Sequence, residues 1–99
     1  MTDLDGPPTS VRIDIWLWRA RFFRTRSLSA MHVRRSGIRL SQAGQVRRTD
    51  KPGAALTVGD IVTLGKGGHI VSVVVLDLGI RRGPAGEARA LYRLLEAEP

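Results

Sequence analysis

The spacing of apolar residues changes near Gly37, and this change separates a helical first part of the chain from a strand-rich second part. Up to Phe23 the apolar residues recur every three or four positions, which is typical of the buried face of a helix. Asp14 falls in the first turn, where a carboxylate favours the helix N-terminus. The apolar face of this first predicted helix consists of Ile13, Trp16, Leu17, Ala20 and Phe23.

A second helix is predicted to follow almost directly. Thr25 or Ser27 is suited to begin it, because a side-chain oxygen there can accept a hydrogen bond from an amide of the first turn. Ser36-Gly37 is expected to end it, since glycine is the commonest residue just past a helix. The side chains expected to face inward are Leu28, Met31 and either His32 or Val33.

Beyond Gly37, apolar and polar residues alternate as they do in strands. A polar turn at 41–44 separates Ile38 and Leu40 from Val46 and predicts a hairpin. The further expected elements are turns at 51–53 and 65–68, strands at Ile61–Leu64 and His69–Leu78, and a final helix over Glu87–Leu95 with Ala88, Leu91, Tyr92 and Leu95 on one face. This order predicts one α+β domain over residues 12–95, preceded by a disordered lead-in over residues 1–11.

The length and composition fit a single small domain. A chain of 99 residues with 42% hydrophobic residues can bury one core without disulfides, and the sequence contains no cysteine. The longest apolar run, Val73 to Leu76, is too short to cross a bilayer, and the acidic, polar start does not resemble a signal peptide. We therefore expect a soluble cytoplasmic protein with no membrane partner.

The charge is concentrated in one segment. The whole chain carries +7, but Arg12 to Lys51 holds eleven basic and two acidic residues, a net charge of +9, which leaves −2 for the remainder. Most of the basic residues are arginine, whose planar guanidinium binds phosphate through two hydrogen bonds and stacks on bases. A GC-rich genome would explain arginine in place of lysine, but it would not explain the asymmetry. The pattern favours a nucleic acid as the partner over an anionic membrane or an acidic protein.

No catalytic or metal-binding arrangement is visible in the sequence. His32 and His69 stand alone, without the H-x-x-x-H spacing of metal sites, and the serines lie outside the G-x-S-x-G motif of nucleophiles. The segment Gly65-Lys66-Gly67-Gly68 lacks the rest of a phosphate-binding P-loop and is better explained as a hairpin turn. We expect a protein with no enzymatic activity, no cofactor and no metal ion.

The aromatic residues near the N-terminus are expected to have two different roles. Trp16 and Phe23 share the apolar face of the first predicted helix and are expected in the core. Trp18 falls nearer the opposite face, among arginines, and is the better candidate for stacking on a base. The alternative for Trp18 is packing against the C-terminal helix.

One stretch near the N-terminus resembles a family signature. It reads Arg12-Ile13-Asp14-Ile15-Trp16-Leu17-Trp18, followed by Arg21-Phe22-Phe23-Arg24-Thr25-Arg26-Ser27-Leu28. This stretch resembles the S-four RNA-binding domain, also called the alpha-L RNA-binding motif, and within that superfamily the fifteen-kilodalton heat-shock protein subfamily. Lys51-Pro52, Arg81-Arg82-Gly83-Pro84-Ala85, Glu87-Ala88 and Ala90-Leu91-Tyr92 are similar to the same subfamily, so the resemblance extends to Arg93.

The resemblance implies two helices and a small antiparallel β-sheet that bind RNA without catalysis. Members of the subfamily associate with the large ribosomal subunit, especially with stalled subunits that still carry a nascent chain on tRNA, and they can be heat-induced. This sequence departs from the generic pattern in its first hairpin, which reads Ser36-Gly37-Ile38-Arg39-Leu40-Ser41-Gln42 in place of G-x-V-x-V-N-G. It also ends at Pro99, without the basic extension of longer members.

The predicted RNA-binding surface combines the two helices with the first hairpin. Its cationic side chains would contact phosphates, while the shape of the RNA and its 2′-hydroxyls would give selectivity. The predicted residues are Arg12, Arg21, Arg24, Thr25, Arg26, Ser27, Arg34, Arg35, Arg39, Arg47, Arg48 and Lys51. The expected partner of a monomeric protein is ribosomal RNA, or tRNA on the large subunit, with weak DNA binding in addition. Two alternatives are a detached targeting module of an rRNA or tRNA modification system and a general nucleic-acid binder.

Overall fold

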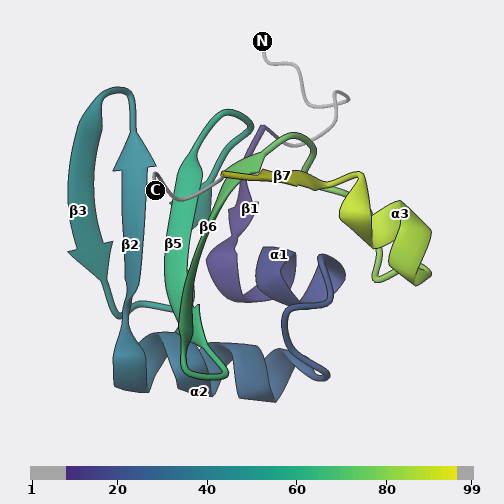
Figure 1. Cartoon of the computed structure of the whole chain (residues 1–99), viewed down its shortest axis with the longest axis horizontal. Helices are drawn as coiled ribbons and strands as arrows, with labels where there is room; N and C mark the ends of the chain where they lie inside the picture. Colours follow the sequence, from purple (N-terminus) through teal and green to yellow (C-terminus); the bar gives the residue numbers. More distant parts are fainter. Residues whose placement is uncertain (1–8, 96–99) are drawn as a thin grey trace, which may run out of the picture.

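The computed structural model describes residues 9–95 and consists of a β-sheet with helices packed against it (Figure 1). In chain order the elements are β1 (Val11–Arg12), α1 (Ile13–Arg19), α2 (Arg26–Ser36), β2 (Ile38–Gln42), β3 (Gln45–Thr49), β4 (Ala55–Leu56), β5 (Ile61–Lys66), β6 (His69–Val75), α3 (Ala85–Arg89) and β7 (Tyr92–Leu94). The main sheet is antiparallel with strand order β3-β2-β5-β6-β7, and β1 pairs separately with β4. The predicted α+β class is confirmed.

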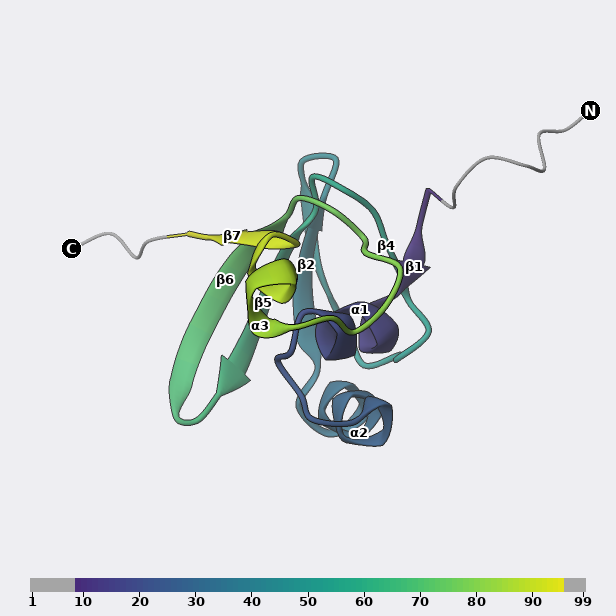
Figure 2. The ribbon, with the colours of Figure 1, turned by 90° about the vertical axis from the view of Figure 1, so that its right-hand side faces the viewer.

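Two helices cover one face and one end of the sheet. Figure 2 shows α1 beside the sheet, with the β1–β4 pair beyond it and α2 below it. In Figure 1, α2 runs across the lower end of the strands. The basic segment Arg12–Lys51 includes α2, which crosses this end, and the β2–β3 hairpin, which forms one edge of the sheet.

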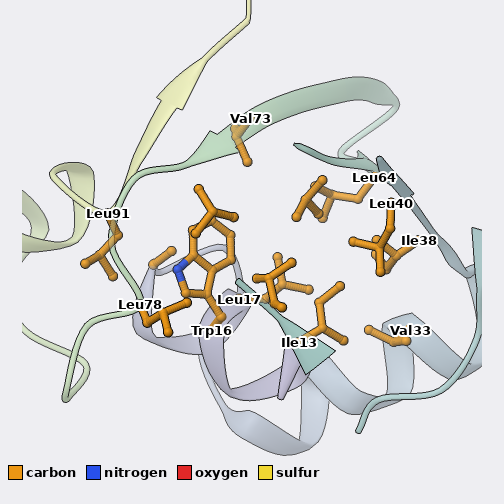
Figure 3. Packing of buried hydrophobic residues seen from close by; sticks show 14 residues of the cluster. Ile13, Trp16, Leu17, Val33, Ile38, Leu40, Leu64, Val73, Leu78 and Leu91 are labelled. Carbon is orange, nitrogen blue, oxygen red and sulfur yellow. The ribbon is translucent and has the colours of Figure 1, made fainter. Parts of the chain in front are cut away.

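Trp16 lies in the middle of the hydrophobic core (Figure 3). Its side chain is fully buried, its Nε1 donates a 2.9 Å hydrogen bond to the carbonyl oxygen of Asp77, and its ring packs edge-on against Tyr92. The core also contains the other expected residues of this helix, Ile13, Leu17 and Ala20. The predicted apolar face of α1 is therefore confirmed for these four residues.

Helix α1 is shorter than the apolar spacing predicted. It ends at Arg19, and Arg21 adopts a φ of 67°, a left-handed conformation that a helix cannot contain. Phe23 therefore lies on the loop before α2, where it is half-buried at the border of the core. Its predicted place on the helix face is wrong.

Helix α2 has the predicted ends but a different buried face. Thr25 is its N-cap, and Gly37 follows its last residue with a φ of 76°. The residues that α2 buries are Ser29, Ala30 and Val33, whereas Leu28 and Met31 are 45% and 41% exposed. The small Ser29 allows α1 and α2 to approach closely, and its hydroxyl donates a 2.8 Å hydrogen bond to the carbonyl oxygen of Asp14. The prediction that Leu28 and Met31 point inward is therefore wrong.

Both predicted hairpins form, with tight turns. The β2–β3 turn consists of Ala43 and Gly44, with φ of 50° and 82°, and the β5–β6 turn of Gly67 and Gly68, with φ of 61° and 83°. Two consecutive residues with positive φ match the twist of antiparallel strands, which is why two residues suffice. Residues 41 and 42, predicted in the turn, therefore continue β2, and β6 ends at Val75 rather than at Leu78.

The predicted helix over Glu87–Leu95 is wrong in its second half. Helix α3 ends at Arg89, and Tyr92–Leu94 form strand β7, which pairs with the edge of β6. This pairing satisfies backbone groups of β6 and places the Tyr92 ring 5.0 Å from the ring of Phe22. The apolar spacing in this short segment fits both arrangements, and the free sheet edge decides between them.

The start of the described chain is ordered by a strand pair that the sequence pattern did not predict. Most of the expected lead-in, residues 1–11, lies outside the described residues, but Val11 belongs to β1 and pairs with Leu56. Within residues 9–95, no helix is long and apolar enough to cross a membrane.

Candidate nucleic-acid interface

Helix α2 presents a stripe of basic residues beside an open hollow. Arg26, Ala30 and Arg34 follow one another at intervals of four along the helix and border a hollow of about 520 Å³. Its lining also includes Ser27, Met31 and Asp14. Both arginines are exposed. We call this feature the basic hollow.

Arg12 is held beside the basic hollow by Asp14. The Nε and Nη2 of Arg12 donate hydrogen bonds of 3.0 and 2.9 Å to the two carboxylate oxygens of Asp14, and this bond with the nearby negative charge raises the pKa of Arg12. The side chain of Arg12 stays 54% exposed, whereas that of Asp14 is 5% exposed. The guanidinium is thus oriented by a buried carboxylate and still faces solvent.

The turn that contains Lys51 lies against the start of α1. The backbone amide of Asp14 donates a 3.2 Å hydrogen bond to the carbonyl oxygen of Pro52, and a Cβ on Gly53 would lie 3.8 Å from the Cζ of Arg12. Lys51 itself is exposed. Two cations that are far apart in sequence, Arg12 and Lys51, therefore flank the same end of α1.

The residues at the start of α2 have unequal roles. The Oγ1 of Thr25 accepts a 3.0 Å hydrogen bond from the amide of Leu28, so this oxygen serves the helix as its cap. The Cζ of Arg26 lies 5.9 Å from the centre of the Trp18 ring, a cation–π contact that orders Arg26 and covers part of the half-buried Trp18. Arg24 and Ser27 are exposed.

Besides Arg12, three predicted arginines donate hydrogen bonds to acceptors within the chain. The Nε of Arg21 donates to the carbonyl oxygen of Gly83 at 2.7 Å, and the Nη2 of Arg47 donates to the Oε1 of Gln42 at 3.1 Å. The Nη2 of Arg48 donates to the carbonyl oxygen of Ser36 at 2.6 Å, at the negative end of α2. These three side chains hold loops and the hairpin in place, and none of them lines the basic hollow.

Arg39 and Arg48 face each other on the first hairpin. They occupy paired positions on β2 and β3 and border a hollow of about 320 Å³. Like charges at paired positions repel, and the hydrogen bond from Arg48 to the carbonyl oxygen of Ser36 offsets part of this cost. Arg35 lies on a third side, where it lines a hollow of about 280 Å³ on the flank of α2 opposite the basic hollow.

The positive charge of these surfaces is largely unneutralised. Within residues 9–95 the ion pairs are Arg12–Asp14 and Arg81–Glu87, and the second lies outside the basic segment. In the same range no three acidic or histidine side chains come together as a metal site. The structure thus offers phosphate-binding groups and no arrangement of metal ligands among the described residues.

The predicted site residues did not include three residues that line the basic hollow, Asp14, Ala30 and Met31. The interval of four between Arg26, Ala30 and Arg34 was visible in the sequence and could have identified the stripe. Asp14 and Met31 could not be found in that way, because their places in the lining follow from the packing of α1 across α2.

The chain is similar to several heat shock proteins. No family model matches it. A heat shock protein 15 homolog of Aeromonas salmonicida is 37% identical over 89 residues, which cover 90% of this chain and 64% of the relative. Heat shock protein 15 of Escherichia coli K12 is 35% identical over 88 residues, 89% of this chain and 62% of the relative. The chain therefore spans somewhat less than two thirds of the length of these relatives.

A solved structure agrees with these similarities. The trimeric heat shock protein 15 of Vibrio cholerae superimposes with a TM-score of 0.74 and 34% sequence identity, over 87% of this chain and 82% of the other. Fold and sequence agree over most of both chains. The chain belongs to the heat shock protein 15 family.

Proposed function

We propose that this protein binds structured RNA through the basic hollow and the surfaces beside it, with ribosomal RNA of the large subunit as its ligand. The observation that carries the proposal is the positive charge of the arginines at the basic hollow, which acidic side chains leave largely unneutralised. Arg26 and Arg34 border a hollow whose one carboxylate, Asp14, is already bound to Arg12. Guanidinium groups arranged in this way favour a ligand with repeated phosphates.

Helix α2 sets the spacing of the phosphate contacts. Arg26 and Arg34 are eight residues apart, about 12 Å along the helix axis, so each would bind a different phosphate. The N-terminal end of α2 adds the positive end of the helix dipole next to Arg24 and Ser27. Arg12 and Lys51 would extend the contact to a neighbouring part of the backbone.

The choice of RNA over other polyanions is supported by the resemblance to the S-four RNA-binding domain. Phosphate contacts position a protein, whereas the wide minor groove and the 2′-hydroxyls distinguish A-form RNA. As in the resembled subfamily, the protein would act in the cytoplasm without catalysis of its own, on large subunits stalled with a nascent chain on tRNA. The names of the relatives support the heat-shock part of this role.

Two matched double variants test the proposal. R26E/R34E reverses both arginines of the basic hollow, and R89E/R93E makes the same change in charge on α3 and β7. We expect R26E/R34E to weaken binding to an rRNA hairpin at least a hundredfold, because two charge-assisted contacts become repulsive, and R89E/R93E to weaken it only slightly. If both variants are folded and lose the same affinity for the hairpin, then only the net charge of the protein determines RNA binding.

Cosedimentation with ribosomal subunits tests the proposed ligand. We expect the protein to pellet with large subunits, most strongly with those that carry a nascent chain on tRNA. Equal affinity for duplex DNA and hairpin RNA would indicate a general nucleic-acid binder instead. Sedimentation velocity of the protein alone reports the oligomeric state, where the expectation of a monomer stays a prediction and the trimeric Vibrio cholerae relative is the reason to measure it.

A further inference from the structure

A second, chemically different groove runs along the flank of α2 opposite the basic hollow. It joins two hollows, of about 280 and 520 Å³, that share Phe23, His32 and Ser36. Leu28 and Met31 of α2 form one wall, and the β5–β6 turn with Ile70 forms the other. We call it the lateral groove.

The floor of the lateral groove is aromatic. The rings of Phe23 and His32 lie 4.9 Å apart with an interplanar angle of 39°. Both side chains are half-buried, while Ile70 at the wall is 81% exposed. An exposed isoleucine beside half-buried rings provides an apolar surface on which a flat molecule can rest.

The polar groups of the groove are placed to bind an anionic ligand that also has a hydrogen-bonding edge. Lys66 lies with its Nζ 5.8 Å from the centre of the Phe23 ring, and Arg35 lines the other end. The lining contains no carboxylate. The Nε2 of His32 is buried and has no hydrogen-bond partner among the described residues, so a ligand that displaces the groups covering it would complete its hydrogen bonding.

We propose that the lateral groove binds one unpaired nucleotide of the RNA, with its base between the Phe23–His32 floor and Ile70 and its phosphate at Lys66. The edge of the base would complete the hydrogen bonding of His32. This inference rests on the proposed function, because the same RNA would occupy the basic hollow. Cations at both ends and the absence of carboxylates in the lining favour a nucleotide over an apolar peptide.

The position of α2 allows one RNA molecule to contact the basic hollow and the lateral groove at the same time. Arg26 and Arg34 point to one flank of the helix, and His32 and Arg35 to the other, while Met31 lines hollows on both sides. Helix α2 lies across the end of the molecule, below α1 (Figure 2). An RNA backbone on one flank can therefore place a bulged nucleotide on the other flank.

The test compares two RNA hairpins that differ in one nucleotide. One is fully paired in its stem, and the other has a single bulged uridine. The variants are I70D and H32L in the lateral groove, with I80D as the matched control, since Ile80 is 88% exposed and lies outside the groove. Fluorescence anisotropy gives the dissociation constant for each pair, and analytical ultracentrifugation gives the oligomeric state.

We expect wild type and I80D to prefer the bulged hairpin by about tenfold, and I70D and H32L to bind both hairpins alike. R26E/R34E should weaken binding to both hairpins and keep the preference. A 4-thiouridine in the bulge should cross-link to a peptide that contains Phe23, His32 or Ile70.

Different failures are distinguishable. If wild type binds both hairpins equally tightly, or if I70D and I80D behave alike, the groove does not hold a nucleotide, although RNA binding stands. If I70D changes the oligomeric state and leaves the preference for the bulge intact, the groove contacts a second copy of the chain and the inference is wrong. If wild type binds neither hairpin, the proposed function fails and this inference fails with it.

Discussion

Trp16 and Trp18 are two residues apart on α1 and have different surroundings. Trp16 is fully buried and hydrogen-bonded to Asp77, whereas Trp18 is half-buried under Arg26. We expect Trp16→Ala to lower the free energy of unfolding by about 3–5 kcal/mol, as for other buried aromatics, and Trp18→Ala to lower it much less. Urea unfolding followed by circular dichroism measures both. Equal losses would mean that the buried face of α1 is assigned wrongly.

His32 makes stability depend on pH in a predictable direction. Burial, and then the positive charge of Lys66, lower the pKa of His32 below its ordinary value of 6.5, and the nearby backbone of Gly65, which favours the protonated ring, opposes them. The unfolded chain therefore binds a proton more readily than the folded one. Stability is complete above the unfolded pKa and is lost as the pH falls from about 6.5 through the folded pKa.

His32→Gln tests this dependence. We expect the free energy of unfolding of the wild type to fall between about pH 7 and pH 5, and that of His32→Gln to fall less over the same range. Chemical denaturation at half-unit intervals of pH measures both. His69→Gln is the control, since His69 is exposed on the β5–β6 hairpin. A loss of slope in His69→Gln, with His32→Gln unchanged, would contradict the assignment.

The arginines show how far residue type alone could identify the interface. The concentration of charge in Arg12–Lys51 was visible from the sequence, and so was its meaning as a site for a polyanion. The sequence did not show which guanidinium groups already donate hydrogen bonds within the chain. Arg21 bonds to Gly83, which is 62 residues away, and Arg48 bonds to the last carbonyl of α2. Hydrogen-bond acceptors that come close only through tertiary packing cannot be recognised from the local sequence.

At the scale of the element, Thr25 fixes the start of α2 and with it the direction of the basic stripe. We expect Thr25→Ala to lower the free energy of unfolding by about 1 kcal/mol, because the amide of Leu28 loses its acceptor. Thr25→Ser keeps an oxygen in the same place and should lose much less. Thermal unfolding compares the two variants. A serine variant as unstable as the alanine variant would show that the cap is not the reason.

Elements whose pattern is local were predictable, and elements that depend on a neighbour were not. The caps of α2 and the glycines of the β5–β6 turn act within a few residues, so the sequence indicates them directly. Strand β7 exists because β6 offers a free edge, and β1 because β4 lies beside it. The prediction that Leu28 points inward was wrong because it also depended on a neighbouring element: α2 packs against α1 through the small Ser29 and Ala30 instead.

At the scale of the whole molecule, the order of the elements along the chain determines where the positive charge lies. The five consecutive elements from β1 to β3 carry the basic segment, and among them α2 crosses one end of the strands and the β2–β3 hairpin forms one edge of the sheet (Figure 1). Residues 52–95 hold five basic and three acidic residues, a net charge of +2 against +9 for Arg12–Lys51, so the positive charge of the described residues is concentrated in the basic segment. Such a molecule approaches a polyanion with its basic end first, which raises the rate of association.

The salt dependence of RNA binding reports how many cationic side chains of the protein contact RNA phosphates. Of the ten predicted cationic residues, Arg21, Arg47 and Arg48 donate to carbonyl or amide oxygens and hold loops or the hairpin in place, which leaves seven; Arg12 is counted among the seven because its side chain stays 54% exposed beside Asp14. Each neutralised phosphate contributes a slope of roughly −0.7 to −0.9 in log K against log salt, so seven contacts predict roughly −5 to −6, whereas ten would give roughly −7 to −9. We expect the shallower value in titrations from low to physiological salt. R26E/R34E should reduce it further, by about one for each lost contact. A slope near zero would exclude phosphate contacts as the source of affinity, and a slope of the steeper kind would mean that the three internally bonded arginines also reach the RNA.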